Sequence, residues 1–429
     1  MEIRTETLPG PQDIARHELA NGIVVLVREN LHVRSVVITG ALDAGSIFET
    51  PDTQGVASFT ASMLLRGTHT RNFDTIHEML EGSGAKLAMS SGRHTVGFSG
   101  KSLREDLPML LDLLADGLRN PAFPADYVEK LRGQLVTNYK FREEDTRYIA
   151  GRTFRELAYP AAHPYSQPID GTLASIETIT RDHMIEFHRR QYGPGGMFIV
   201  VVGAVDTAAT IQMIAERFAD WRNPDQQPQP ELPEIPSMIE VRQQVVPMQD
   251  KSQSDVVLGV PSLSRYADDW IAANIANSIL GVFGMYGRIG AEVREKRGLA
   301  YYAYSRIEGG IGPGPWRVIA GVNPVNVPQT VAAIRDEIRR IITEPVTAEE
   351  LADNKANFIG RLPLRLESNE GVAGSIVAME RYQLGLDYLQ RYAAMVNAIT
   401  VEDVLAAAQR YLNPDVYALA VAGPDIPAE

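Results

Sequence analysis

The order of apolar and polar residues predicts strands and helices in both halves of the chain. Asn21-Gly22 separates two apolar segments, as in a β-hairpin. Further strands are expected in the first half over 33–42 and from Met197, with helices over 53–65, 103–118, 125–142 and 181–190. In the second half, strands are expected over 239–246, 255–260, 299–306 and 316–322, and helices over 266–280, 289–296 and from about 327, 348, 370 and 401. This mixture predicts α+β domains, each with helices packed on one face of a mostly antiparallel sheet.

A long-range repeat joins the two halves. Ile179-Thr180, Arg190, Pro194 and Gly203 recur 220 residues later as Ile399-Thr400, Arg410, Pro414 and Gly423 (399 minus 179, and 423 minus 203). Both copies read as a helix with a threonine at its start, a proline-containing break and an apolar strand that ends in glycine. The repeat predicts two duplicated domains, with chance similarity of two helix-strand units as the alternative.

A proline-rich segment lies near the midpoint of the chain. Residues 221–237 contain five prolines, which disfavour helices and central strands and favour an extended connector. We therefore expect an N-terminal domain over 1–220, a linker over 221–237 and a C-terminal domain over 238–429.

Composition excludes several classes of function. The net charge of −13 and the lack of a basic stripe argue against a nucleic-acid partner. The chain has no cysteine, which excludes disulfides, thiolate metal sites and a cysteine nucleophile. The N-terminus lacks the features of a signal peptide, and no apolar run has the length of a membrane span. We expect a soluble protein, cytoplasmic on the sequence as given and periplasmic if a signal peptide was removed.

The segment from Val293 to Ser305 lies where a helix should end and a strand begin. Its cations and Gly298 suit the C-terminus of a helix, so a purely structural role is one interpretation. In the other interpretation, Arg294 and Tyr301 converge across the turn and donate hydrogen bonds to a carbonyl or an oxyanion.

With its surroundings, this segment resembles the M16 family of zinc metallopeptidases, which includes insulin-degrading enzyme and the mitochondrial processing peptidase. The resemblance covers nearly the whole chain and rests on stretches in family order: 43–49, 54–57, 63–68, 163–165, 279–289 and 293–305. It implies two duplicated α+β domains and peptide substrates.

The chain departs from the family at the zinc motif. Active members carry His-x-x-Glu-His on a helix, in which the two histidines bind zinc and the glutamate activates water. The flanking residues place this frame on Ser58-Phe-Thr-Ala61-Ser62, and a third ligand should fall near Thr137 or Asn138. Because these side chains are not zinc ligands, we expect no metal and no catalytic residue in this chain.

Three other segments are weak candidates for chemistry. His183 and His188 enclose Glu186, but their spacing puts the two rings about 140° apart on a helix, too far to share one ion. Residues 308–314 are glycine-rich without the Lys-Ser/Thr of a phosphate loop, which favours a flexible hairpin connection. Ser58 and Ser62 have no adjacent base.

The resemblance implies a role in a pair of chains. Some M16 peptidases are heterodimers in which one subunit keeps the zinc motif and the other supplies an Arg/Tyr pair that holds the substrate. We expect this chain to be the second kind: it would bind unfolded peptide through Arg294 and Tyr301, opposite the zinc of its partner. The alternative is a structural or peptide-binding protein without a proteolytic role, with a homodimer possible in isolation. Net charge alone would favour basic peptides.

Overall fold

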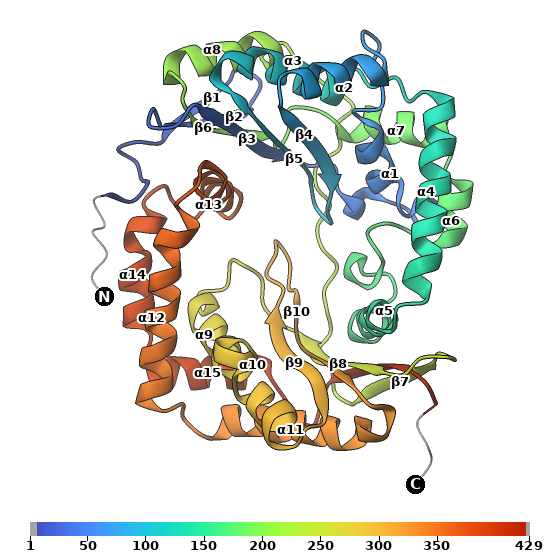
Figure 1. Ribbon diagram of the computed structural model, residues 1–429, viewed down its shortest axis with the longest axis vertical. Coiled ribbons are helices and arrows are strands. Elements are labelled where there is room, and N and C mark those ends of the chain that lie inside the picture. The colour runs from blue at the N-terminus through green and yellow to red at the C-terminus, as the bar shows by residue number, and fades with distance from the viewer. Residues whose placement is uncertain (1–6, 426–429) are drawn as a thin grey trace.

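The computed structural model describes residues 7–425 as two mixed α/β layers that lie one above the other in Figure 1. The elements of the first half are β1 (Ala15–Glu18), β2 (Val24–Glu29), β3 (Ser35–Leu42), α1 (Val56–Met63), α2 (Phe73–Gly82), β4 (Lys86–Ser91), β5 (Val96–Leu103), α3 (Leu107–Arg119), α4 (Ala125–Glu143), α5 (Thr146–Ala158), α6 (Leu173–Thr178), α7 (Arg181–Gln191), β6 (Phe198–Gly203) and α8 (Thr207–Phe218). The elements of the second half are β7 (Arg242–Pro247), β8 (Ser254–Pro261), α9 (Trp270–Gly281), α10 (Phe283–Ile289), the π-helical turn η6 (Gly290–Lys296), β9 (Ala300–Ile307), β10 (Pro315–Val322), α11 (Val327–Thr343), α12 (Ala348–Arg365), α13 (Asn369–Arg381), α14 (Tyr388–Ala398), α15 (Val401–Tyr411) and β11 (Ala418–Gly423).

The two sheets share one topology around the repeated segments. The first has the order β1-β2-β6-β3-β5-β4 and the second the order β7-β11-β8-β10-β9. Strand β6 pairs parallel with β2 and antiparallel with β3, and β11 pairs in the same way with β7 and β8. The helix before each strand begins at a threonine in a capping box, Thr180 or Thr400. The predicted α+β class with two duplicated, mostly antiparallel sheets is therefore confirmed.

Each sheet packs one face against helices of its own half. The first core joins side chains of the first sheet, such as Ile38 and Val201, to apolar faces of helices such as α1 and α3. The second core does the same around the fully buried Trp316 of β10. No helix among residues 7–425 combines the length and the apolar character needed to cross a lipid bilayer.

The opposite face of each sheet is covered by a helix from the other half. Helix α5 lies on the second sheet, where Ile149, Ala150 and Phe154 pack against Val257 and Ile319. Reciprocally, α13 lies on the first sheet, and Figure 1 shows both helices between the two layers. The expected helices on one face are thus present within each half, and the exchange of α5 and α13 buries the second face of both sheets.

Residues 221–237 form neither helix nor strand, and side chains attach the segment to the folded body. Trp221 is buried in the first core, and Leu232 and Ile235 pack beside α5. Gln229 contacts His94, with 2.8 Å between Nε2 and Nδ1. The boundaries 1–220, 221–237 and 238–429 stay predictions.

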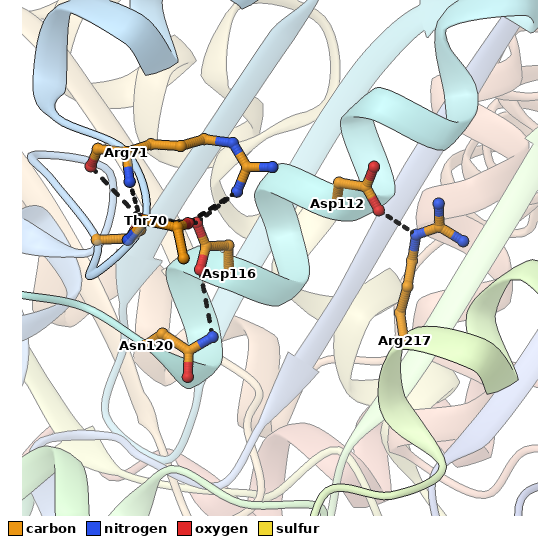
Figure 2. A network of polar contacts seen from close by, with 7 residues as sticks. Thr70, Arg71, Asp112, Asp116, Asn120 and Arg217 are labelled. Carbon is orange, nitrogen blue, oxygen red and sulfur yellow. Dashed lines mark hydrogen bonds and ion pairs between the residues drawn. The ribbon is translucent and has the colours of Figure 1, made fainter.

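A buried carboxylate fixes the loop that follows α1. Asp116 of α3 is only 8% exposed and accepts hydrogen bonds from Thr68 Oγ1 (2.6 Å), Thr70 Oγ1 (2.7 Å) and Arg71 Nη1 (2.6 Å), as Figure 2 shows. Asn120 Nδ2 donates to its other oxygen at 3.2 Å. Burial by itself would raise the pKa of Asp116, but the hydrogen bonds outweigh it and hold that pKa below its usual value.

We expect Asp116→Asn to lower the free energy of unfolding by about 2–3 kcal/mol, because it leaves buried donors and a guanidinium without their acceptor. Since the pKa of Asp116 is lowered in the folded state, its stabilising effect is present above about pH 4 and is lost as the pH falls further. Urea unfolding at several pH values measures both effects.

Asp112 of the same helix provides the matched control. Its side chain is half-exposed, and Arg217 Nε donates to it at 2.6 Å (Figure 2). Asp112→Asn should cost less than about 1 kcal/mol, as for other exposed ion pairs. Equal losses in the two variants would contradict the structural role of Asp116.

Candidate functional site

Arg294 lies in the π-helical turn η6, just before the chain reverses into β9. The backbone closes this turn, because the N–H of Gly298 donates to the carbonyl of Arg294 at 3.1 Å and Gly298 takes a left-handed φ of 62°. The neighbouring cations Lys296 and Arg297 both pair with Glu292. The side chain of Arg294 makes no hydrogen bond or ion pair with any residue in 7–425.

Tyr301 lies on the other side of the turn, at a β-bulge near the start of β9. Ala300 pairs with Val322 and Tyr302 with Gly321, so Tyr301 has no partner of its own on β10. Its side chain is 69% exposed, and its hydroxyl has no hydrogen-bond partner in the part of the chain that the structure describes. The structure thus places Arg294 and Tyr301 on either side of one turn and holds neither in a cap or a core.

The frame of the zinc motif lies on α1 in the first half. Ser58 and Ser62 are one helical turn apart on the accessible side of α1, as histidine ligands would be. Ala61 is only 2% exposed and belongs to the first core. A catalytic carboxylate at position 61 would therefore replace a buried methyl group in the core.

Polar contacts tie this frame to the neighbouring loop and to α4. Ser58 Oγ donates to Asp170 Oδ1 at 3.0 Å, and Arg142 Nη1 of α4 contacts Asp170 Oδ2 at 2.7 Å. The hydrogen bond with Asp170 raises the pKa of Arg142 above its usual value. A permanent guanidinium charge therefore lies beside the position where active relatives hold zinc.

Glu49 fixes the start of α1. Its carboxylate accepts hydrogen bonds from the backbone N–H groups of Gly55 and Ala57, both at 2.9 Å, at the N-terminus of the helix. Burial raises the pKa of Glu49 to about 8, and these two N–H groups oppose the rise. Glu49 thus serves the local fold of α1.

The positions expected for a third ligand lie on α4. Thr137 and Asn138 are exposed, and Thr137 Oγ1 donates to the carbonyl of Gly133 at 2.8 Å. Two serines, a buried alanine, a threonine and an asparagine beside an arginine do not match the imidazole and carboxylate ligands of zinc. The donor set present here does not fit the metal.

We expect the isolated chain to bind no zinc tightly. Metal analysis after dialysis against excess zinc and desalting should give well below one zinc per chain. The triple variant Ser58→His, Ala61→Glu, Ser62→His should also recover little activity, because no third ligand is present and Ala61 is buried. One tightly held zinc per unmodified chain would contradict this prediction.

The other candidate segments have structural partners. His183 Nδ1 accepts a hydrogen bond from the N–H of Thr180, whereas His188 Nε2 contacts the carbonyl of Leu118 at 2.8 Å. Burial lowers the pKa of His188 to about 4, so that its ring is neutral at pH 7. Glu186 pairs with two arginines of its own helix. These three residues do not form a shared site.

Residues 308–314 connect β9 and β10 as a hairpin. Glu308 pairs with Arg155 of α5 and Arg317 of β10. The N–H of Gly312 donates to Tyr165 Oη at 2.9 Å. These contacts hold the connection against α5 and the loop after it, and they leave no role for it as a phosphate loop.

One feature near the frame escapes the sequence analysis, a cavity of about 440 Å³ between α5, the loop containing Asp170 and the second sheet. Its lining includes seven arginines that are scattered between positions 93 and 317. No local motif marks them, because the fold alone brings them together.

Comparison with known proteins assigns both halves to one family. Residues 24–164 match the family model described as insulinase (peptidase family M16), and residues 178–358 match the model described as peptidase M16 inactive domain. An uncharacterized zinc protease of Mycobacterium leprae is 26% identical over 96% of this chain and 92% of its own length. A similarly named protein of Bacillus subtilis is 24% identical over 96% of this chain and 98% of its own length.

Solved structures agree with these matches. The crystal structure of a peptidase M16 inactive domain from Pseudomonas fluorescens has a TM-score of 0.89 at 26% identity and covers 97% of this chain and 99% of its own. A protease from Helicobacter pylori has the same fold, with a TM-score of 0.88 at 21% identity over 97% of this chain and 100% of its own. With two models of one family matching successive parts of the chain, and with the fold shared over nearly its whole length, the protein belongs to the M16 peptidase family.

Proposed function

We propose that this chain is the non-catalytic, substrate-binding subunit of a heterodimeric M16 zinc metallopeptidase, whose partner carries the His-x-x-Glu-His motif. The observation that carries the proposal is the contrast between two sites. The zinc frame at Ser58, Ala61 and Ser62 offers no ligand and lies beside Arg142. Arg294 and Tyr301 are present, and their side chains are free of partners in the described part of the chain.

In this role Arg294 and Tyr301 act on the substrate and not on the metal. A guanidinium and a phenol that hydrogen-bond the carbonyl next to the scissile bond would hold the peptide and stabilise the oxyanion that develops on it. Such a site requires donors that are not already used within the protein. The exposure of Tyr301 and the unpaired side chain of Arg294 support this requirement.

The peptide itself would bind in an extended form. Strands β4 and β9 are the last strands of their sheets, and an unfolded peptide adds to such an edge through main-chain hydrogen bonds that tolerate many sequences. Tyr301 lies on β9, so a peptide on this edge would pass its hydroxyl. This arrangement favours unfolded segments over folded proteins as substrates.

Mixing this protein with an M16 chain that carries the zinc motif, taken from the same genome, tests the proposal. The mixture should elute as a heterodimer and hydrolyse an unfolded peptide well above the rate of the partner alone, whereas this chain alone should not. Co-elution without any gain in rate would favour a structural subunit. A homodimer that ignores every zinc-bearing M16 chain would favour a peptide-binding protein outside proteolysis.

A further inference from the structure

The cavity beside α5, which we call the arginine cavity, is lined by cations from both halves of the chain. The first half contributes Arg93, Arg142, Arg147, Arg152 and Arg155. The second half contributes Arg306 of β9 and Arg317 of β10. Asp170 is the single carboxylate in the same lining. In a chain with a net charge of −13, this is a strong local excess of positive charge.

Neighbouring carboxylates compensate only part of this charge. Glu308 is shared between Arg155 and Arg317, so one negative charge serves two guanidinium groups. Arg317 Nε is buried without a hydrogen-bond partner among the described residues. Arg306 is exposed and makes no hydrogen bond or ion pair within 7–425.

Arg147 is also incompletely paired. Its Nε donates to the neutral hydroxyl of Tyr302 at 3.0 Å, and its nearest recorded carboxylate oxygen, on Asp255, is 3.9 Å away. That carboxylate already accepts a hydrogen bond from the hydroxyl of Tyr302. The cavity therefore presents guanidinium donors that an incoming anion could use.

The mutual effect of these cations is visible in Arg93. Burial lowers the pKa of Arg93 to about 10, and the charge of Arg155 lowers it further in the same direction. Like charges held in a partly enclosed site focus the field and attract counter-ions from solution. An anionic ligand would relieve this repulsion.

The extent of the cavity indicates more than one negative group. Arg147 and Arg155 lie eight positions apart on α5, which corresponds to about 12 Å along the helix axis. Carboxylates on alternate residues of an extended peptide are separated by about 7 Å, so two or three of them match this length. The planar fork of each guanidinium suits a carboxylate, and the rings of Tyr148 and Tyr304 add apolar surface between the charges.

We propose that the arginine cavity binds acidic side chains of an extended peptide, which makes peptides with closely spaced Asp or Glu residues the favoured substrates. This inference rests on the proposed function insofar as the peptide is the substrate of the heterodimer. It reverses the expectation of basic peptides from net charge, because the local charge of the cavity opposes that of the whole chain.

Binding of fluorescent peptides to the isolated full-length chain tests the proposal by anisotropy, without any partner. An extended peptide with alternating Glu residues should bind at least about tenfold more tightly than the same peptide with Gln, as expected for charge-assisted hydrogen bonds. Its affinity should fall between 50 and 200 mM salt, roughly as screening predicts. Equal binding of the Glu and Gln peptides would overturn the proposal.

Variants then locate the site. Arg306→Glu and Arg147→Gln should each weaken binding of the Glu peptide about fivefold or more, and Arg306→Lys should keep most of it. The matched control is Arg104→Glu, an exposed arginine outside the cavity that also has no side-chain partner within 7–425. Equal losses in Arg104→Glu and Arg306→Glu would overturn the proposal, as would competition by inorganic phosphate at concentrations at which acetate has no effect.

These results are independent of the heterodimer test. A chain that stimulates its partner on all peptides alike would keep the proposed function and contradict the acidic preference. A chain that binds the Glu peptide selectively without stimulating any zinc-bearing M16 chain would keep the cavity's role and contradict the proposed function.

Discussion

Arg294→Ala and Tyr301→Phe are each expected to lower turnover by the reconstituted heterodimer about 10²-fold or more, the scale for losing one oxyanion donor. Either change removes donors that the developing oxyanion would use, and neither should disturb the fold. Tyr301 is 69% exposed, and Arg294 has no ion pair in residues 7–425. Steady-state kinetics on the mixed subunits, with assembly followed by gel filtration, measures the effect.

Arg297→Ala is the matched control for Arg294. It removes a guanidinium three positions further on, and that guanidinium is already paired with Glu292. It should leave turnover within about twofold of the unmodified pair, as for other exposed ion pairs. Unchanged turnover in Tyr301→Phe, with normal assembly, would remove this hydroxyl from the mechanism. If Tyr301 only stabilised the sheet, its hydroxyl would contribute on the order of 1 kcal/mol to folding and nothing to turnover.

Local patterns in the sequence carry much of the fold. The Asn21-Gly22 turn joins β1 and β2, and the repeated segments 179–203 and 399–423 have equivalent places in the two sheets. Helix α5 is absent from the sequence-based prediction because its residues, from Thr146 to Ala158, are largely polar and include a glycine. Its apolar side chains are few, and they meet a sheet formed more than 90 residues later, which no local pattern indicates.

The candidate site divides in the same way. The degenerate frame at Ser58 to Ser62 and the Arg294/Tyr301 turn are contiguous motifs, so their flanking residues predict them. The arginine cavity depends on tertiary structure, because it combines α4, α5 and two strands of the second sheet. Net charge hides it, since a total of −13 says nothing about where seven arginines gather.

Separate expression of the fragments 1–220 and 238–429 should give chains that do not fold stably, whereas co-expression should restore the fold. Without α13, the first sheet would expose a face that includes Phe198, Val200 and Val202. Without α5, the second sheet would expose a face that includes Val257 and Ile319. Each such side chain contributes about 1.5–3 kcal/mol when buried, so the loss approaches the 5–15 kcal/mol that stabilises a typical domain.

The exchanged helices make the two halves depend on each other, and a nicked chain distinguishes this dependence from a simple effect of chain cleavage. A protease site introduced within 223–237 breaks the backbone but keeps both halves, so the nicked protein should remain one particle on gel filtration and unfold in one transition. Near-ultraviolet circular dichroism and thermal unfolding compare it with the fragments. A fragment 1–220 or 238–429 that unfolds cooperatively at the temperature of the whole chain would contradict this dependence. It would instead support independent domains at the predicted boundaries, with α5 and α13 as dispensable covers.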